Sequence, residues 1–191
     1  RNSVNARLEG LAFSGGSLGT GSGAGVRAEG SGLVIVDCVF DQNSTGDGDG
    51  AALSAVSCTL TAEGCTFSGN QAQATVVGSG LGGAVSITDG TALLRACIFE
   101  NNLSREIGGG GMGVSGAAVV TVLGGRFSGN SAATTATGVA DTFGGGGGAA
   151  LRGAASLTIT GTVFENNSLT GGSGGAIRVI GTGNAADLRV A

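Results

Sequence analysis

The sequence predicts an all-β fold: a right-handed, single-stranded parallel β-helix of five to six coils, with three short strands in each coil. Three observations predict it. A phrase built on Phe and Asn recurs along the chain, a Gly-rich phrase recurs between its copies, and apolar residues alternate in runs too short for helices. We expect residues 1–191 to form a single β-helix domain that is a segment of a longer chain or of a fibre.

The first phrase is Phe-x-x-Asn, which uses six of the seven Phe residues. The Phe positions are Phe13, Phe40, Phe67, Phe99, Phe127 and Phe164. The Asn positions are Asn43, Asn70, Asn102, Asn130 and Asn167, and Gly16 takes the Asn place in the first copy. Residues that recur at one position of each coil stack on their equivalents, so the phrase predicts an internal ladder of Phe and another of Asn.

The second phrase is a Gly-rich run followed by Ala or Gly and then an aliphatic residue. Gly82-Gly83-Ala84-Val85 and Gly174-Gly175-Ala176-Ile177 are full copies, and Val114 and Leu151 are assigned as the aliphatic residues of two less regular copies. From the aliphatic residue to the next Phe there are 13 or 14 residues, but from Phe to the next aliphatic residue there are 13 to 24. Because stacked strands keep their length while loops vary, we expect variable loops after each Asn.

The half of constant length holds two more short strands. In one copy Leu33 and Ile35 alternate along a strand, a two-residue turn follows, and Cys38 and Phe40 alternate along the next. Equivalent strands of successive coils pair in parallel about 4.8 Å apart. Alternate side chains then point inward and form vertical stacks of Phe, Cys, Leu and Ile.

The two phrases together resemble the repeat pair of the chlamydial polymorphic outer-membrane proteins and similar right-handed β-helix repeat proteins. The resemblance covers essentially the whole chain. It implies a surface-displayed β-helix with adhesive or structural duties. The nine basic residues are all Arg, and the chain is rich in Ala and Gly, which is unlike the chlamydial members and indicates another lineage.

Composition excludes several partner classes. The net charge is −4, whereas nucleic acids and anionic membrane surfaces attract clustered Lys and Arg. No apolar run approaches the roughly 18 residues of a membrane span, so no membrane insertion is expected of this segment. We expect protein partners or self-association, end to end or lateral, and glycans as further candidates. No cofactor is expected.

The Asn ladder has a structural explanation. Asn tolerates the left-handed backbone that a sharp corner needs, and stacked amides donate and accept hydrogen bonds from coil to coil. Two of the three Asn-x-Ser/Thr sequons use ladder residues, Asn43 and Asn102. Asn166 precedes the ladder by one residue and is the candidate glycosylation site, with a chance sequon as the alternative.

The chain has four Cys, of which Cys38, Cys65 and Cys97 share one inward slot, while Cys58 lies outside it. The strand spacing allows a Cys38–Cys65 disulfide, although stacking in register sets the two side chains awkwardly. The alternative is that the thiols are small core residues. Without His or Cys-x-x-Cys, a zinc site is not expected.

Two groups of acidic residues are candidate sites. Asp47 and Asp49 in a Gly-rich loop are a weak calcium candidate, with a solvated turn as the alternative. Asp41, Glu100 and Glu165 follow the Phe on alternate coils, so neighbouring acids would lie about 10 Å apart along the axis. This position of the repeat therefore carries no acid on consecutive coils, as a pair of catalytic carboxyl groups would favour. We therefore expect no catalytic residues.

The longest insertion, residues 131–147, holds Phe143 beside Asp141. An apolar residue in a loop contacts a partner or packs down as a cap over the coil, and both interpretations stay open.

These observations predict a non-enzymatic, extracellular or cell-surface β-helix with a structural or adhesive role. The loops after each Asn form its contact edge. The alternative is a polysaccharide-binding or polysaccharide-cleaving β-helix.

Overall fold

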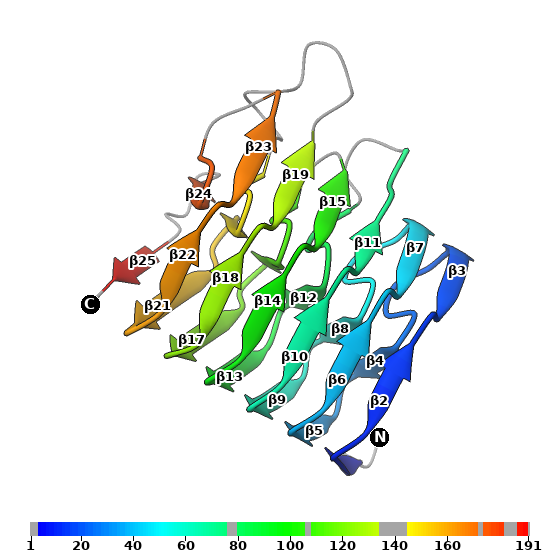
Figure 1. Cartoon of the computed structure of the whole chain (residues 1–191). Helices are drawn as coiled ribbons and strands as arrows, with labels where there is room; N and C mark the ends of the chain where they lie inside the picture. The colour runs from blue at the N-terminus through cyan, green and yellow to red at the C-terminus, as the bar shows by residue number, and fades with distance from the viewer. Residues whose placement is uncertain are drawn as a thin grey trace.

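The computed structural model describes residues 4–75, 80–105, 108–133, 145–171, 174–181 and 187–190 of the chain. In these residues it contains 25 strands, arranged in four parallel sheets, A to D, and no helix long and apolar enough to cross a membrane (Figure 1). Each of six coils contributes one strand to each sheet, in the order A, B, C, D, and β25 adds a seventh strand to sheet A.

The strands of each sheet run from the first coil to the last. Sheet A consists of β1 (Asn5–Glu9), β5 (Gly32–Val36), β9 (Thr59–Glu63), β13 (Thr91–Arg95), β17 (Val119–Leu123), β21 (Ser156–Thr160) and β25 (Asp187–Val190). Sheet B consists of β2 (Ala12–Ser14), β6 (Val39–Asp41), β10 (Thr66–Ser68), β14 (Ile98–Glu100), β18 (Arg126–Ser128) and β22 (Val163–Glu165). Sheet C consists of β3 (Ser17–Thr20), β7 (Ser44–Asp47), β11 (Gln71–Ala72), β15 (Leu103–Arg105), β19 (Ser131–Ala133) and β23 (Ser168–Thr170). Sheet D consists of β4 (Val26–Glu29), β8 (Leu53–Val56), β12 (Val85–Thr88), β16 (Met112–Ser115), β20 (Ala149–Arg152) and β24 (Ile177–Ile180).

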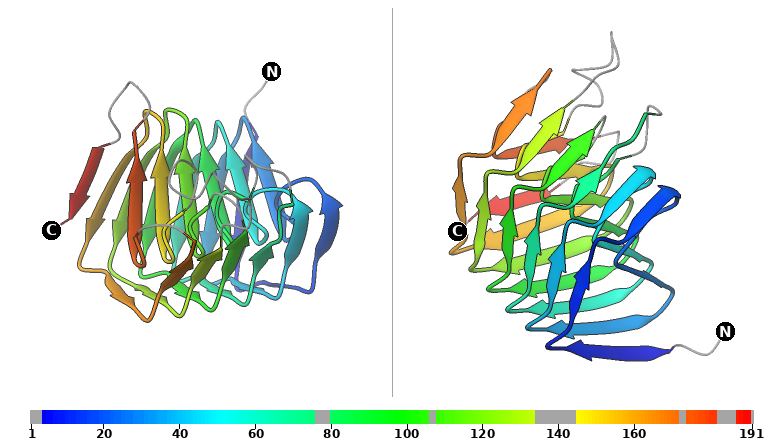
Figure 2. Two further views of the ribbon diagram at one scale, coloured as in Figure 1. Left: turned by 90° about the horizontal axis from the view of Figure 1, so that it is seen from above. Right: turned by 45° about the vertical axis from the view of Figure 1, so that its right-hand side comes forward.

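The prediction of a right-handed parallel β-helix is confirmed. Each strand pairs in parallel with its equivalents in the neighbouring coils, and sheets B and C follow one another along one wall of the solenoid (Figures 1 and 2). The right-handed sense is the one that connections between parallel strands almost always take.

The number of strands per coil differs from the expectation of three, because sheet C forms directly after each ladder Asn. In its four central strands, the residues that point inward are at most 3% exposed, but they are small or polar: Thr45, Ala72, Ser104 and Ala132. These strands therefore lack the aliphatic alternation that revealed the other three.

In the structure, Val114 and Leu151 lie one inward position after the place that the sequence predicts for them. Val85 pairs with Met112, whereas Val114 pairs with Ile87. Leu151 in turn pairs with Val114, so its position is displaced in the same way. The corner from sheet D to sheet A has two residues after β12 but three after β16 and after β20. Length therefore varies at this corner as well as after each Asn.

The Phe residues form one continuous column inside sheet B. Neighbouring rings have centroids 4.3 to 4.9 Å apart and planes inclined by 5 to 15°. The spacing of parallel strands imposes this separation. The four central rings are completely buried, while Phe13 and Phe164 at the two ends are partly exposed. The column is thus the most voluminous part of a narrow core.

The Gly-rich phrase is explained by this column. A Cβ added to Gly111 would lie 2.9 Å from the Phe127 ring, and one added to Gly148 would lie 3.0 Å from the Phe164 ring. The position before each sheet D strand therefore takes only Gly or Ala. The Phe phrase and the Gly phrase are two sides of one packing contact.

The Asn residues form a second column, in the corner between sheets B and C. Asn70 illustrates its bonding: its backbone N–H and its Nδ2 both donate to Oδ1 of Asn102, at 2.9 and 3.0 Å. Its Nδ2 also donates to the backbone oxygen of Phe40 at 2.9 Å, and its own Oδ1 accepts from Asn43. Each central amide thus uses all of its donors and two acceptor positions.

The left-handed backbone lies one residue before the ladder, not on it. Gln42, Asn101 and Asn166 have φ between 52 and 55°, and Gly69 and Gly129 have φ of 61°. The ladder Asn is therefore explained by its hydrogen bonds alone. The residue before the ladder Asn adopts the left-handed conformation that the corner needs.

The Phe column predicts unequal costs of truncation. Phe67→Ala removes a ring buried between two others and is expected to lower the free energy of unfolding by about 3–5 kcal/mol. Phe13→Ala removes a partly exposed ring that stacks on one side only, so its cost should be less than half as large. Urea unfolding of both variants measures the difference, and equal costs would contradict a column buried from both sides.

Candidate functional site

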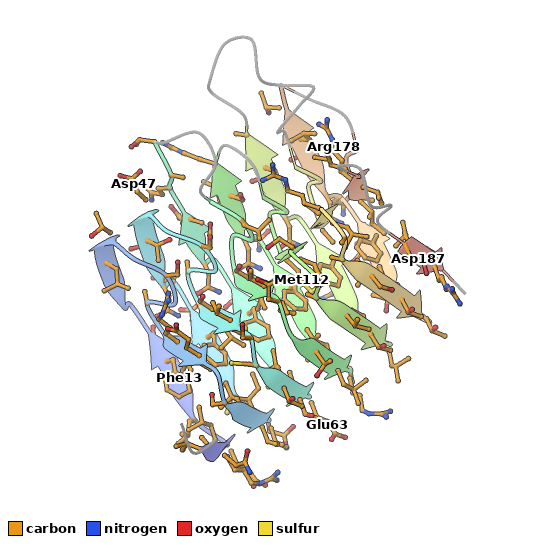
Figure 3. The ribbon with its side chains drawn as sticks, turned by 180° about the vertical axis from the view of Figure 1, so that it is seen from behind. Phe13, Asp47, Glu63, Met112, Arg178 and Asp187 are labelled. Atoms are coloured by element: carbon orange, nitrogen blue, oxygen red, sulfur yellow. The ribbon has the colours of Figure 1, made fainter. Side chains whose placement is uncertain are left out.

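The loop edge is the row of segments that connect sheet C to sheet D. These segments are 21–25, 48–52, 73–84, 106–111, 134–148 and 171–176, and they contain 5, 5, 12, 6, 15 and 6 residues. By contrast, every connection from sheet A to B and from B to C contains two residues. Asp47 lies at this edge, and Glu63 lies at the opposite end of the cross-section (Figure 3).

The loop edge folds back over the outer face of sheet D. Ser54 and Ser86 point away from the core by strand alternation, yet each is only 2% exposed. A Cβ on Gly50 would lie 2.9 Å from the Ser86 side chain, and one on Gly113 would lie 2.5 Å from Leu81. The inner parts of the segments 48–52 and 73–84 are therefore packed, and Leu81 is buried.

The two calcium candidates bind the following loop. Oδ1 of Asp47 accepts hydrogen bonds from the backbone N–H and the hydroxyl of Thr75, at 2.8 and 2.7 Å. Oδ1 of Asp49 accepts from the backbone N–H of Leu81 at 2.7 Å. Within the described ranges, no group of three or more His, Cys, Asp or Glu side chains could hold a metal ion. The carboxylates thus serve as clamps between successive loops.

Asp49 is the more deeply placed of these clamps. Burial raises its pKa above the ordinary value, and the hydrogen bonds from Leu81 and Gly80 and the charges of Arg152 and Arg27 offset only part of that rise. A folded state with a raised carboxyl pKa takes up a proton more readily than the unfolded chain. Protonation of Asp49 therefore favours the folded state.

The charged side chains on the outside of sheet B form pairs. Arg126 binds Glu100 on one side and Glu165 on the other, the latter at 3.2 Å. Ser68 donates its hydroxyl hydrogen to Asp41 at 2.6 Å. The acids that follow the Phe are thus joined to side chains on the coils between them.

The three Cys of the shared slot are stacked and buried, and all four thiols of the chain are free. The Cys38–Cys65 disulfide that the spacing allows is not formed. Sγ of Cys38 instead lies 3.3 Å from the backbone oxygen of Val36. A hydrogen bond with Cys65, together with burial, raises the pKa of Cys97. Cys97 therefore stays a thiol near neutral pH.

The candidate glycosylation site is exposed. Asn166 occupies the left-handed corner position with φ of 54°, and its side chain faces solvent. Asn43 and Asn102 of the other two sequons have their amides inside the ladder. Asp141 and Phe143, the candidate partner contacts, lie outside the described residues.

The clamp role of Asp47 and Asp49 was not foreseen from the sequence. Their Gly neighbours gave a general turn signal. Their partners lie 28 and 32 residues further on, in a loop whose path depends on the stacking of coils.

Comparison with protein families finds a match inside the chain. Residues 64–88 match the Chlamydia polymorphic membrane protein repeat. This stretch runs from the turn before Phe67 to the end of β12, so it contains one Phe-x-x-Asn and one Gly-Gly-Ala phrase. No curated protein and no solved structure matches the chain. The match and the parallel solenoid together show a β-helix repeat protein that is similar to the polymorphic membrane proteins.

The clamp predicts a pH dependence of stability. Because the pKa of Asp49 is raised in the folded state, its contribution to stability grows as the pH falls through that pKa. Asp49→Asn keeps an acceptor oxygen but does not titrate, so the wild type should gain stability relative to this variant on acidification. Asp49→Ala leaves the Leu81 N–H without its acceptor and should cost about 1–3 kcal/mol at pH 7.

Chemical unfolding of the three proteins between pH 7 and pH 4 measures both effects. A difference between wild type and Asp49→Asn that stays constant over this range would contradict the burial of the carboxylate.

Proposed function

We propose that the chain is a surface-displayed β-helix with a structural or adhesive role, and that its loop edge contacts the partner. One observation carries the proposal: segments of 5 to 15 residues emerge along this one edge, on a framework whose A–B and B–C turns all contain two residues. Such an arrangement lets the contact surface change without disturbing the core. The cell-surface location is supported by the match to a repeat of a polymorphic membrane protein.

The proposal places no catalysis on the outer face of sheet B. Glu100 and Glu165 share the guanidinium of Arg126, and Asp41 accepts a hydrogen bond from Ser68. Glycoside cleavage needs one carboxyl group held as an acid and a second as a base or nucleophile. Here both glutamates bind one guanidinium and Asp41 binds a serine, so this face holds no pair of carboxyl groups free to act on a substrate. Release of reducing ends from a polysaccharide by the purified chain would overturn this part.

The ladder bears on how the protein assembles. At the last complete coil, Oδ1 of Asn167 accepts from Asn130, and its Nδ2 donates to Phe127. Continuing the ladder requires a side-chain oxygen to accept from the Asn167 backbone. The first coil offers Gly16 in this position, which has no side chain. A contact between these two coils of separate copies would therefore interrupt the ladder, whereas contacts through the loop edge would leave it intact.

The proposal is tested by shortening the loop edge. Replacing 73–84 with the five residues of 48–52 should reduce adhesion of cells that display the chain severalfold, because the contact surface is removed while the sheets are kept. Ile98→Thr, on the outer face of sheet B, is the matched control and should leave adhesion unchanged. Adhesion is counted under flow, and circular dichroism checks the fold.

Display is tested separately with Fab fragments raised against the folded chain. They should label intact cells of the source organism without permeabilisation. Labelling that requires permeabilisation would refute surface display, and full adhesion by the shortened variant would refute the role of the loop edge.

A further inference from the structure

A hollow of about 450 Å³ lies on the outer face of sheet A, at the corner that leads in from sheet D. It spans the first three coils, and its lining includes Asn5, Gly32, Val34, Thr59 and Thr61. This volume is within the range of sites that bind small molecules, about 300–1,000 Å³. The hollow is remote from the loop edge, so its function does not depend on the one proposed above.

The hollow exists because Gly32 has no side chain. Asn5, Gly32 and Thr59 are paired neighbours in sheet A, and the next coil continues this row with Thr91. A Cβ on Gly32 would lie 2.3 Å from Oδ1 of Asn5, so the amide of Asn5 extends across the gap. Asn5 on one side of Gly32 in this row and Thr59 on the other thus form polar walls around exposed backbone.

The polar groups of the hollow are available to a ligand. Ser57, which also lines it, and Thr59 and Thr61 contribute hydroxyl groups, and Asn5 contributes an amide. Within the part of the chain that the structure describes, these four side chains form no hydrogen bond with protein. Hydroxyls and an amide both donate and accept, so they match a ligand that does the same.

The hollow carries no charge. None of its lining residues is ionisable, and Arg7, whose position on β1 pairs with Val34, binds Glu9 at 2.9 Å. A charged ligand would lose hydration here without gaining a counter-charge. The side chain of Val34 adds an aliphatic surface among the hydroxyls. The combination suits a neutral molecule with both hydroxyl and C–H surfaces.

We propose that this hollow binds a neutral sugar unit of a glycan. The hydroxyls of Thr59, Thr61 and Ser57 and the Asn5 amide hydrogen-bond the sugar hydroxyls, and Val34 contacts the C–H face of the ring. The hollow is open to solvent, so a longer chain can continue beyond it.

The test is a titration of the full ¹⁵N-labelled chain, followed by NMR. The probes are cellobiose, maltose and N,N′-diacetylchitobiose, with glucuronic acid as the charged comparison. At least one neutral disaccharide should shift the amide signals of Gly32, Val34 and Thr59 in a saturable way, and glucuronic acid should not. Absence of saturable shifts with all three disaccharides, saturation at other residues only, or equal binding of glucuronic acid would overturn the proposal.

Two variants fix the location. Gly32→Val fills the hollow with a side chain that strands favour, and the Asn5 amide it would meet is the mobile end of an exposed side chain. It should weaken binding by at least about tenfold, equivalent to about 1.4 kcal/mol. Thr61→Val removes one hydroxyl at constant shape and should weaken binding severalfold. Ser156→Val, in the same row at the far end of the sheet, should have no effect. Unchanged binding by both Gly32→Val and Thr61→Val would refute the site.

Discussion

The hydrogen-bonded Asn column is the constraint on which the rest of the solenoid depends. Each central amide is buried, and its donors reach the amide of the next coil and the Phe carbonyl of the previous one. A slip of one residue in any coil would leave these groups unpaired in a dry core, where each costs about 1–3 kcal/mol. The column therefore holds the B–C turn at two residues in every coil. It keeps the Phe rings in register and, through them, limits the position before sheet D to Gly or Ala.

The same constraint directs variation elsewhere. Beyond sheet C, segments of very different length are tolerated. In the described residues, Asp47 and Asp49 accept hydrogen bonds from backbone N–H groups of the next segment. Leu81 of that segment packs onto sheet D. A rigid spine with a variable, partly clamped edge suits a protein that presents contacts at a surface. The flat outer face of sheet A is a second surface, where the absence of one side chain at Gly32 makes a hollow.

Much of the fold could be predicted from the sequence, because its strongest signals are periodic. The Phe and Asn positions gave the coils and the parallel pairing directly. The sequence does not reveal sheet C because the inward residues of its central strands, such as Ala72 and Ser104, are small or polar. The assigned position of Val114 is displaced because an extra corner residue precedes β17. The clamps at Asp47 and Asp49 depend on contacts between coils, which spacing along the chain does not show. The hollow depends on a missing side chain, whose meaning appears only when Asn5, Gly32 and Thr59 are placed in one row.

The central claim is that the ladder amides, rather than the corner conformation, hold the coils in register. The direct measurement is the free energy of unfolding of Asn102→Ala compared with that of its exposed neighbour, Asn101→Gly, which keeps the left-handed corner. The account predicts a loss of more than about 3 kcal/mol for Asn102→Ala, because several buried groups lose their partners at once. It predicts a change within about 0.5 kcal/mol for Asn101→Gly. Similar costs for the two variants would contradict it.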